Sequence, residues 1–345
     1  GAHAAVTQGD DIQLTYVEVL GRAVSLAAWL QQEGMRRGDR LGLLAGNRWE
    51  VFVAHYAAAA LRVVLLNLNT RLAPPELAYI IDDAEPTFVI AEDGLAPPLR
   101  QAIPLLRRPP PALVWVACGA PPAEPAPPPA REARFSAALE AGAALARGFS
   151  PPPLLEASEG YQMYYTSGTS GFPKGVVLSY ANVSAHAHAA ITEFGFGPSD
   201  AWGHFAPMYH LVDAYAIYAL TWVGGSHALL PTWETQAALR VMANCRLSAT
   251  HVAATMLQML LTNPLRPTLD LSALRMISCG GSALPTALVA QAFEAFGAAF
   301  FTSYGMTECC GKISVSRLGP SELGLPPAEQ LRLVGSQGKP FTGME

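Results

Sequence analysis

Charged side chains are scarce in this sequence. Asp, Glu, Lys and Arg together make up 14% of the 345 residues, whereas hydrophobic residues make up 51%. This composition excludes an intrinsically disordered chain, which carries many charges and few apolar residues. Lys and Arg form no clusters and the net charge is −5, so a nucleic-acid partner is excluded as well. The length allows a large core and exceeds one average domain.

Cysteine is also scarce, and its five positions lack the spacing of a metal site. An odd number of thiols favours free cysteines in a reducing compartment, the cytoplasm or another intracellular one. The adjacent pair Cys309 and Cys310 is interpreted as inert, buried thiols, with a redox-active pair as the alternative. No secretory signal is evident at the start of the sequence.

A long hydrophobic run is missing too. Residues 214–233 contain no Asp, Glu, Lys or Arg, which is almost the length that spans a bilayer. A Gly-Gly pair, a histidine and a proline divide this run into a helix, a turn and a strand. A transmembrane segment is therefore not predicted, and the sequence gives no indication of the oligomeric state.

The N-terminal part of the chain alternates between helical and strand-like patterns. Thr15 and Glu18 have the spacing of a capping box, which predicts a helix that Gly34 ends. The predicted apolar face of this helix includes Val19, Leu20, Ala23, Leu26 and Leu30. Further strands are predicted at residues 40–45, 63–66 and 87–91, and further helices at 50–61 and from 74 onward.

Residues 109–129 interrupt this alternation with nine prolines around one apolar, strand-like piece, residues 112–117. We predict a surface excursion there, because proline cannot donate to a central ladder. The alternation then resumes, with strands at 161–165, 176–179, 201–205, 226–230, 250–253, 274–278 and 299–303, and helices from 179, at 255–261 and at 285–296.

Strands separated by helices predict an α/β fold with mostly parallel sheets covered on both faces. We expect two similar layered α/β subdomains, over approximately residues 1–160 and 161–345. In open sheets of this kind, ligands bind beyond the carboxyl ends of the strands. Residues that directly follow a predicted strand are therefore the first candidates for a site.

Residues 164–175 read YYTSGTSGFPKG and suit a polyphosphate ligand. Glycines let the backbone approach a ligand and point N–H groups at it, hydroxyls add donors, and Lys174 adds a mobile positive charge. The spacing is not that of a Walker A loop, which needs four residues between its first Gly and its Gly-Lys-Ser/Thr end. A different phosphate chemistry is therefore indicated, with a plain flexible loop as the alternative.

The loop closely resembles the signature loop of the adenylate-forming superfamily, which contains acyl-CoA synthetases, firefly-type luciferases and peptide-synthetase adenylation domains. The family pattern is Ser/Thr-Ser-Gly-Ser/Thr-Thr-Gly-x-Pro-Lys-Gly. The chain departs from it at Ser170, where Thr is usual, and keeps a hydroxyl there. The matching positions are Thr166, Ser167, Gly168, Thr169, Gly171, Pro173, Lys174 and Gly175. The resemblance implies that the loop hydroxyls and Lys174 hold the β- and γ-phosphates of ATP.

Residues 304–308 (YGMTE) match a second motif of that family, Tyr-Gly-x-Thr-Glu. The resemblance implies that Tyr304 and Gly305 shape the adenine pocket, that Thr307 contacts the α-phosphate, and that Glu308 helps to bind Mg²⁺. This last role is chemically reasonable, because a hard cation prefers carboxylate oxygen together with substrate phosphates. Its charge offsets the negative charge that builds up on the leaving pyrophosphate.

Residues 279–285 (CGGSALP) resemble the family segment whose backbone lines the adenine and acyl pockets. This places Gly280, Gly281 and Ser282 in the expected nucleotide site, where the glycines would allow close approach of the backbone to the ligand. A Gly-Gly turn before a helix is otherwise common.

Residues 207–210 (PMYH) resemble the Pro-x-Phe/Tyr-His motif of acyl-CoA synthetases. In that group the histidine lies beside the carboxylate and is thought to control acyl entry or the thiol half-reaction. His210 is therefore assigned a catalytic role, together with Lys174, Thr307 and Glu308. The other seven histidines, including His186 and His188, are interpreted as ordinary core or surface residues.

Residues 335–340 (GSQGKP) resemble the family's Gly-x-x-Gly-x-Pro turn, which precedes a barrel-like subdomain. The ribose-binding Asp, the hinge and the C-terminal lid domain with its catalytic Lys are not found in these 345 residues. We therefore expect an AMP-binding N-terminal domain without its lid, slow in both half-reactions.

The resemblance implies a two-step reaction. A carboxylic acid and ATP give acyl-AMP and pyrophosphate, and coenzyme A then accepts the acyl group as a thioester. Positioning and electrostatics carry the rate, since no side chain needs to act as the nucleophile. The acyl pocket is expected near Tyr209, Val212, residues 252–256, Gly280 and Met306.

The expected pocket residues are mostly apolar, which favours a fatty or aromatic acid. Asp213 is the only nearby candidate for binding an amino group, so an amino acid substrate is disfavoured. Two alternatives remain open: another adenylating enzyme, such as a luciferase-like oxidase or a carrier-protein ligase, and a catalytically inactive fragment that acts as a binding module.

Overall fold

The computed structural model describes residues 4–9, 12–118, 131–153, 156–166 and 171–344. The chain forms two compact units. The first is Leu14–Ala181, and the second combines Ala2–Gln13 with Asn182–Glu345. The division falls in the first turn of helix α6 (Tyr180–Phe194), so the predicted phosphate loop belongs to the first unit.

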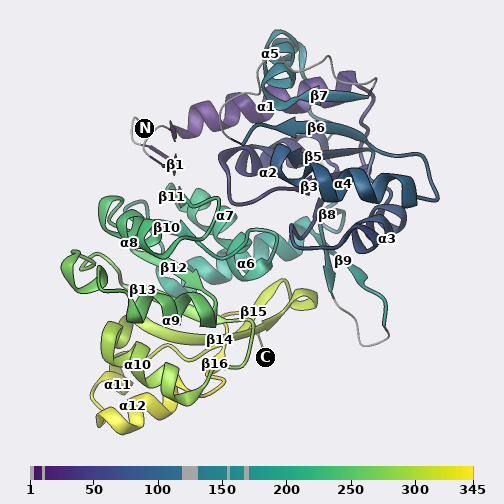
Figure 1. Ribbon diagram of the computed structural model, residues 1–345. Coiled ribbons are helices and arrows are strands. Elements are labelled where there is room, and N and C mark those ends of the chain that lie inside the picture. Colours follow the sequence, from purple (N-terminus) through teal and green to yellow (C-terminus); the bar gives the residue numbers. More distant parts are fainter. Residues whose placement is uncertain (1–3, 10–11, 119–130, 154–155, 167–170, 345) are drawn as a thin grey trace. The chain divides into compact units, whose positions relative to one another are not determined.

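The first unit has a sheet of seven strands among the described residues, in the order β7-β6-β5-β3-β4-β8-β9 (Figure 1). Neighbouring strands are parallel except β8 and β9, which form an antiparallel hairpin. The strands are β3 (Arg40–Leu44), β4 (Val64–Asn67), β5 (Phe88–Glu92), β6 (Ala112–Val116), β7 (Glu132–Arg134), β8 (Gly160–Thr166) and β9 (Lys174–Ser179).

The helices of this unit form two packed groups. Helix α1 contacts α2 and α5, and α3 contacts α4. Their bounds are α1 (Tyr16–Gln32), α2 (Trp49–Leu61), α3 (Pro74–Ala84), α4 (Ala96–Ala102) and α5 (Phe135–Leu145). The capping box at the start of α1 is confirmed, since Glu18 N–H donates to Thr15 Oγ1 and Thr15 N–H donates to the Glu18 carboxylate. Leu20 was wrongly placed on the apolar face: it is 62% exposed, whereas Ala23, Leu26 and Leu30 are buried.

The segment predicted as a surface excursion contains an inner strand instead. All five residues of β6 are buried, and the strand pairs in parallel with β5 and β7. No proline lies within Ala112–Val116, so every residue of the strand has a backbone N–H that can donate a hydrogen bond to a neighbouring strand. Residues 119–130 lie outside the described part of the chain.

The second unit has a nine-stranded sheet within the described ranges, in the order β16-β15-β14-β13-β12-β10-β11-β1-β2. The strands from β14 to β1 are parallel, and β15 and β16 are antiparallel to their neighbours. Their bounds are β1 (Val6–Gln8), β2 (Ile12–Leu14), β10 (Ala201–His204), β11 (Ser226–Leu229), β12 (Ala249–Val252), β13 (Met276–Gly280), β14 (Phe300–Met306), β15 (Gly311–Val315) and β16 (Lys339–Pro340).

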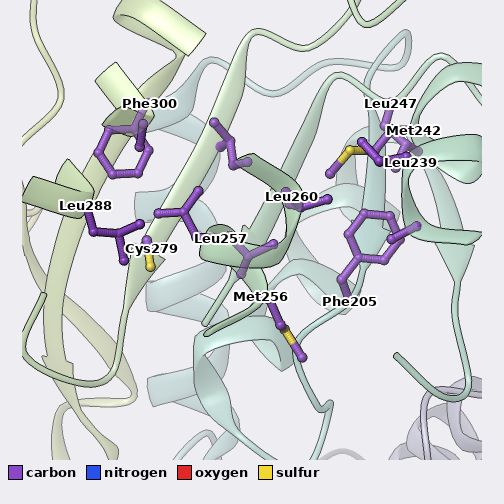
Figure 2. Packing of buried hydrophobic residues seen from close by; sticks show 14 of the residues in the cluster. Phe205, Leu239, Met242, Leu247, Met256, Leu257, Leu260, Cys279, Leu288 and Phe300 are labelled. Carbon is purple, nitrogen blue, oxygen red and sulfur yellow. The ribbon is translucent and has the colours of Figure 1, made fainter. Parts of the chain in front are cut away.

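Apolar residues are buried on both faces of this second sheet. On one face, Phe205, Leu257 and Phe300 belong to a cluster that α8, α9 and α10 complete (Figure 2). On the other face, residues of α6 and α7 pack on Trp202 and Phe301. The helices are α7 (Leu211–Val223), α8 (Thr235–Asn244), α9 (Ala254–Thr262), α10 (Thr286–Phe296), α11 (Pro320–Leu323) and α12 (Pro327–Val334).

These two units confirm the predicted α/β fold class with mostly parallel sheets. Each fully buried Leu or Phe side chain contributes roughly 2 kcal/mol relative to exposure, so helices on both faces give each sheet a large stabilising area. None of the described helices is both long and apolar enough to cross a membrane.

Candidate functional site

The predicted phosphate loop lies in the sequence between β8 and β9, which pair as an antiparallel hairpin. Thr166 pairs with Lys174 and Tyr165 with Gly175, so β9 begins two residues earlier than the sequence predicted. Ser167, Gly168, Thr169 and Ser170 lie outside the described residues. The Lys174 side chain is exposed and forms no ion pair within the described ranges. Its ammonium group is therefore available to an anionic ligand of this loop.

Helix α3 anchors the base of the hairpin. Tyr79 Oη donates to the carbonyl oxygen of Pro173 at 3.2 Å, and its ring lies 5.6 Å from the ring of Phe172. Tyr165 Oη donates to Asp83 Oδ2 at 2.5 Å. Burial, followed by this contact with Asp83, raises the pKa of Tyr165 well above its usual value. The phenol therefore stays a donor at neutral pH and holds β8 to α3.

We expect Tyr79→Ala to loosen the loop without unfolding the unit. The change removes both the ring contact with Phe172 and the hydrogen bond to Pro173. Limited proteolysis should cleave the hairpin several-fold faster than in the original chain. Tyr79→Phe is the matched control: it keeps the ring and should stay near the original rate. Equal cleavage of all three proteins would show that α3 does not anchor the loop.

A cavity of about 360 Å³ lies in the second unit, where β12, β13 and the parallel part of β14 end. The position agrees with the rule that open α/β sheets bind ligands beyond the carboxyl ends of their strands. Seven predicted site residues line this cavity: His210, Gly280, Gly281, Ser282, Tyr304, Gly305 and Thr307. Residues from three separate sequence motifs are therefore brought together.

Two glycines in this cavity cannot carry a side chain. A Cβ on Gly280 would lie 2.4 Å from the carbonyl oxygen of Ser303, and a Cβ on Gly305 would lie 2.0 Å from that of Gly311. The second approach arises because β14 continues to Met306, beyond the predicted end at Ser303. β14 pairs in parallel with β13 as far as Ser303, and from Ser303 to Met306 it pairs antiparallel with β15. The missed signal was the Gly-Lys-Ile-Ser-Val pattern of β15.

Thr307 and Glu308 face different spaces. Both belong to the short 3-10 turn Thr307–Cys309 that follows β14. Thr307 lines the 360 Å³ cavity, whereas the exposed Glu308 lines a second cavity of about 480 Å³ beside His186 and His188. Within the described ranges, no group of three or more His, Cys, Asp or Glu residues is arranged to hold a metal. A cation at Glu308 would therefore need ligand oxygens from a substrate.

His210 occupies the entrance side of the 360 Å³ cavity. Its side chain is exposed, it is the residue that precedes α7, and its ring lies 4.8 Å from the ring of Tyr209. The histidines interpreted as ordinary residues separate into two kinds. His188 is exposed and contacts the ring of Trp222, whereas His186 is buried.

The predicted acyl-pocket set is only partly right. Tyr209, Val252 and Met256 are buried and do not line the 360 Å³ cavity. Alternation along β12 explains this difference for Val252, because its neighbour His251 points to the other face of the sheet. The predicted residues that do line the cavity are Val212, Ala253, Gly280 and Met306.

Two polar residues of this cavity were missed, His251 and Lys312. Both are almost completely buried, at 1% and 3% exposure. His251 Nδ1 lies 2.8 Å from Ser278 Oγ, and burial, with a smaller contribution from Lys312, lowers the pKa of His251 well below its usual value. The inner end of the cavity is therefore polar, which an apolar interpretation of the motifs could not show.

Asp213 has a structural role rather than the amino-group role considered for it. Its side chain is fully buried, Trp202 Nε1 donates to Oδ1 at 3.1 Å, and His204 Nδ1 donates to Oδ2 at 2.5 Å. His204 Nε2 in turn lies 3.0 Å from His227 Nδ1. Trp202 and His204 share one face of β10, and Asp213 follows in the first turn of α7, so this network joins the helix to the sheet.

Comparison with known proteins agrees with these motifs. A family model described as AMP-binding enzyme matches residues 1–345. A 2-succinylbenzoate–CoA ligase of Bacillus licheniformis is 27% identical over 342 residues, which are 98% of this chain and 62% of that protein. A feruloyl-CoA synthase of Amycolatopsis sp is 27% identical over 348 residues, which are 98% of this chain and 64% of that protein. The chain thus spans about six tenths of the length of these relatives.

Two solved structures share the fold. The anthranilate CoA ligase AuaEII in complex with anthranoyl-AMP has a TM-score of 0.82 at 23% identity, and the match covers 99% of this chain and 62% of that one. The N-terminal domain of FACL13 from Mycobacterium tuberculosis has a TM-score of 0.80 at 24% identity and is covered to 78%, with 98% of this chain matched.

Proposed function

The chain belongs to the AMP-binding enzyme family, and from this premise we propose that it takes part in the ATP-dependent activation of a carboxylic acid. A carboxylate oxygen attacks the α-phosphorus, the bond to pyrophosphate breaks, and acyl-AMP forms. Coenzyme A is the proposed acceptor: its thiol sulfur bonds to the acyl carbon, AMP leaves, and the thiol proton passes to solvent. Two CoA-forming relatives, the 2-succinylbenzoate and feruloyl enzymes, support this direction.

One observation carries the proposal. The 360 Å³ cavity collects seven predicted nucleotide- and acid-site residues from three motifs at the carboxyl ends of parallel strands. Two of them, Gly280 and Gly305, lie where the backbone leaves no room for a Cβ. Glycine at these positions keeps the cavity wall thin, which suits a flat adenine or acyl group against the backbone.

The proposed roles follow from the chemistry of each side chain. Lys174 and the hydroxyls of Thr166, Ser167, Thr169 and Ser170 bind the β- and γ-phosphates. Thr307 donates to the α-phosphate, while Tyr304 and residues 280–282 surround the adenine and the acyl group. His210 lies beside the carboxylate that reacts. These groups act by positioning and by offsetting charge.

Glu308 fits the proposed Mg²⁺. Its carboxylate is exposed, and no ion pair with another described residue neutralises it. An exposed carboxylate that shares the ion with phosphate oxygens is the usual arrangement for this metal. When bound, the ion would neutralise charge on the phosphates.

Ligand-induced stabilisation tests the function without requiring turnover. Non-hydrolysable acyl-adenylate mimics with acetyl, aromatic and long-chain acyl groups should raise the melting temperature of the chain, because a ligand at 100 times its Kd stabilises the folded state by about 2.7 kcal/mol. A rise with one class, together with a smaller rise for AMP, would support the adenylate site. No rise with any mimic or with AMP, in a folded sample, would favour an inactive module.

Acceptor choice separates the ligase from the other adenylating enzymes. Acyl-AMP supplied to the full-length protein should be consumed faster when free coenzyme A is added. Consumption that depends instead on oxygen or on a carrier protein would exclude the CoA ligase.

A further inference from the structure

Lys312 has a buried ammonium group without a hydrogen-bond partner in the described residues. Its side chain is 3% exposed, and its Nζ atom contacts neither an acceptor atom nor solvent. Nζ lies over the face of the Tyr215 ring, 4.5 Å from the ring centroid. Buried polar atoms are almost always hydrogen-bonded, so an unpartnered ammonium indicates that a partner is supplied from elsewhere.

Two more buried polar atoms next to Lys312 have no hydrogen-bond partner among the described residues. These are Tyr215 Oη on α7 and His186 Nδ1 on α6. The three residues touch one another: the Lys312 backbone N–H donates to His186 Nε2 at 3.0 Å, and the rings of His186 and Tyr215 lie 5.5 Å apart. Three adjacent buried groups thus lack partners within the described ranges, and two of them, the Lys312 ammonium and the Nδ1–H of neutral His186, can only donate.

Of the groups around this cluster, the Lys312 ammonium is the one that is charged and has no hydrogen-bond partner among the described residues. Burial, and then the Lys312 charge, lower the pKa of His186 to about 3, so His186 is neutral. Burial lowers the pKa of Lys312 to about 8, and the Asp213 carboxylate opposes this change. Lys312 is therefore mostly protonated at neutral pH. Asp213 itself is already engaged by Trp202 and His204.

Lys312 and Gly311 belong to the wall of the 360 Å³ cavity. The exposed lining residues, His210, Ser282 and Tyr304, mark its open side, where the acid is proposed to react. Two of the buried lining residues, His251 and Lys312, are polar, and we take them to mark the closed end. An acyl chain that enters with its carboxylate at the open side therefore points its other end toward Lys312.

We propose, on the basis of the function above, that this cavity selects carboxylic acids carrying a hydrogen-bond-accepting oxygen at the end remote from the activated carboxyl group. Lys312 is the residue that binds this oxygen, after its side chain turns from the ring of Tyr215 toward the cavity. The acceptor is a keto, hydroxyl or second carboxylate oxygen, and a wholly hydrocarbon tail leaves the buried ammonium unpaired. Unpaired buried donors reject such a ligand, as in other sites built to hydrogen-bond a substrate.

Matched acyl-adenylate mimics test the specificity. Each pair has the same chain length and differs in one remote group, for example hexanoyl against 5-oxohexanoyl, 6-hydroxyhexanoyl against heptanoyl, and 4-carboxybenzoyl against 4-isopropylbenzoyl. In at least one pair, the oxygen-bearing member should have a Kd at least tenfold lower. Charge-assisted hydrogen bonds in a buried site have effects of this size.

Lys312→Met should reverse the preference. The variant keeps the length of the side chain and removes its charge, so the oxygen-bearing mimic should bind at least tenfold more weakly and the hydrocarbon mimic equally or more tightly. Lys339→Met is the matched control, since Lys339 is exposed and paired with Glu322 in the same unit; its preference should not change.

The outcomes separate the two proposals. If wild type binds the mimics without preferring oxygen, or if Lys312→Met keeps the preference, the role of Lys312 is overturned and the adenylating function stands. If neither AMP nor any mimic binds wild type, the function itself fails, and the specificity fails with it.

Stability against pH distinguishes a ligand-binding lysine from a structural one. The folded-state pKa of Lys312, about 8, lies below its ordinary value of 10.5. Its burial therefore costs stability fully below pH 8, and the cost disappears as the pH rises toward 10.5. The groups that face it are His186, Asp213, Tyr215 and His251.

Unliganded Lys312→Met should melt above wild type at pH 7 by a margin that narrows toward pH 10. Melting below wild type at pH 7 would assign Lys312 a structural partner and overturn the proposal.

Discussion

Replacing Lys174 with alanine should lower the rate of acyl-adenylate formation about 100-fold. This is the usual effect of removing one preorganised donor that faces developing charge. The exposed Lys174 ammonium lies at the first position of β9, opposite Thr166, and α3 fixes the hairpin that carries it. It has no competing ion pair in the described ranges, so its charge is available to the β- and γ-phosphates. The measurement is kcat/KM for ATP in pyrophosphate exchange with the full-length protein.

The sequence offers few alternatives to Lys174, because the chain has only two other lysines, Lys312 and Lys339. Lys339→Ala is the control, since that exposed side chain already pairs with Glu322, and its exchange rate should stay within about twofold of wild type. The affinity for the acid should change little in Lys174→Ala. An unchanged kcat/KM for ATP would remove Lys174 from the phosphate site.

The fold was largely predictable because hydrophobic periodicity, capping residues and turn residues all gave the same answer. The helix that starts at Thr15 and the parallel strands of both units follow from such local signals. The errors have local causes too. The prolines on both sides of β6 led to the prediction of a surface excursion, although the strand itself contains no proline and is buried. Leu20 was predicted on the apolar face of α1 and is exposed.

Site residues that belong to a known motif could be predicted from the sequence. Site residues that enter the cavity only through the pairing of distant segments could not. Gly280, Tyr304 and Thr307 were found because their segments match a known pattern, and the cavity brings them together. Lys312 was missed because its position depends on the antiparallel pairing of β15 with β14, which places a charged residue inside the sheet's covered face. A lysine in a strand ordinarily predicts solvent, so no sequence signal marked it.

The buried network around Asp213 was hidden for the same reason, and its removal should have the largest effect on stability. We expect Asp213→Ala to lower the free energy of unfolding by at least about 3 kcal/mol, the usual cost of breaking a buried ionic hydrogen bond. Trp202 Nε1 and His204 Nδ1 would both lose their acceptor at 0% exposure. Urea denaturation followed by tryptophan fluorescence measures the change.

Asp213→Asn should cost much less than Asp213→Ala, because the network can reverse its direction. The Asn oxygen still accepts from Trp202, and its amide group donates to His204 Nδ1 if that imidazole changes tautomer. His204 Nε2–H then donates to His227 Nδ1, and His227 Nε2–H donates to the Thr221 hydroxyl, over the recorded separations of 3.0 and 3.2 Å.

Asp270→Ala is the control: Asp270 is an exposed aspartate of the same unit, and its replacement should change the free energy of unfolding by less than about 1 kcal/mol. Equal losses for Asp213→Asn and Asp213→Ala would show that the carboxylate charge is needed. Small losses in both would show that α7 does not depend on this network.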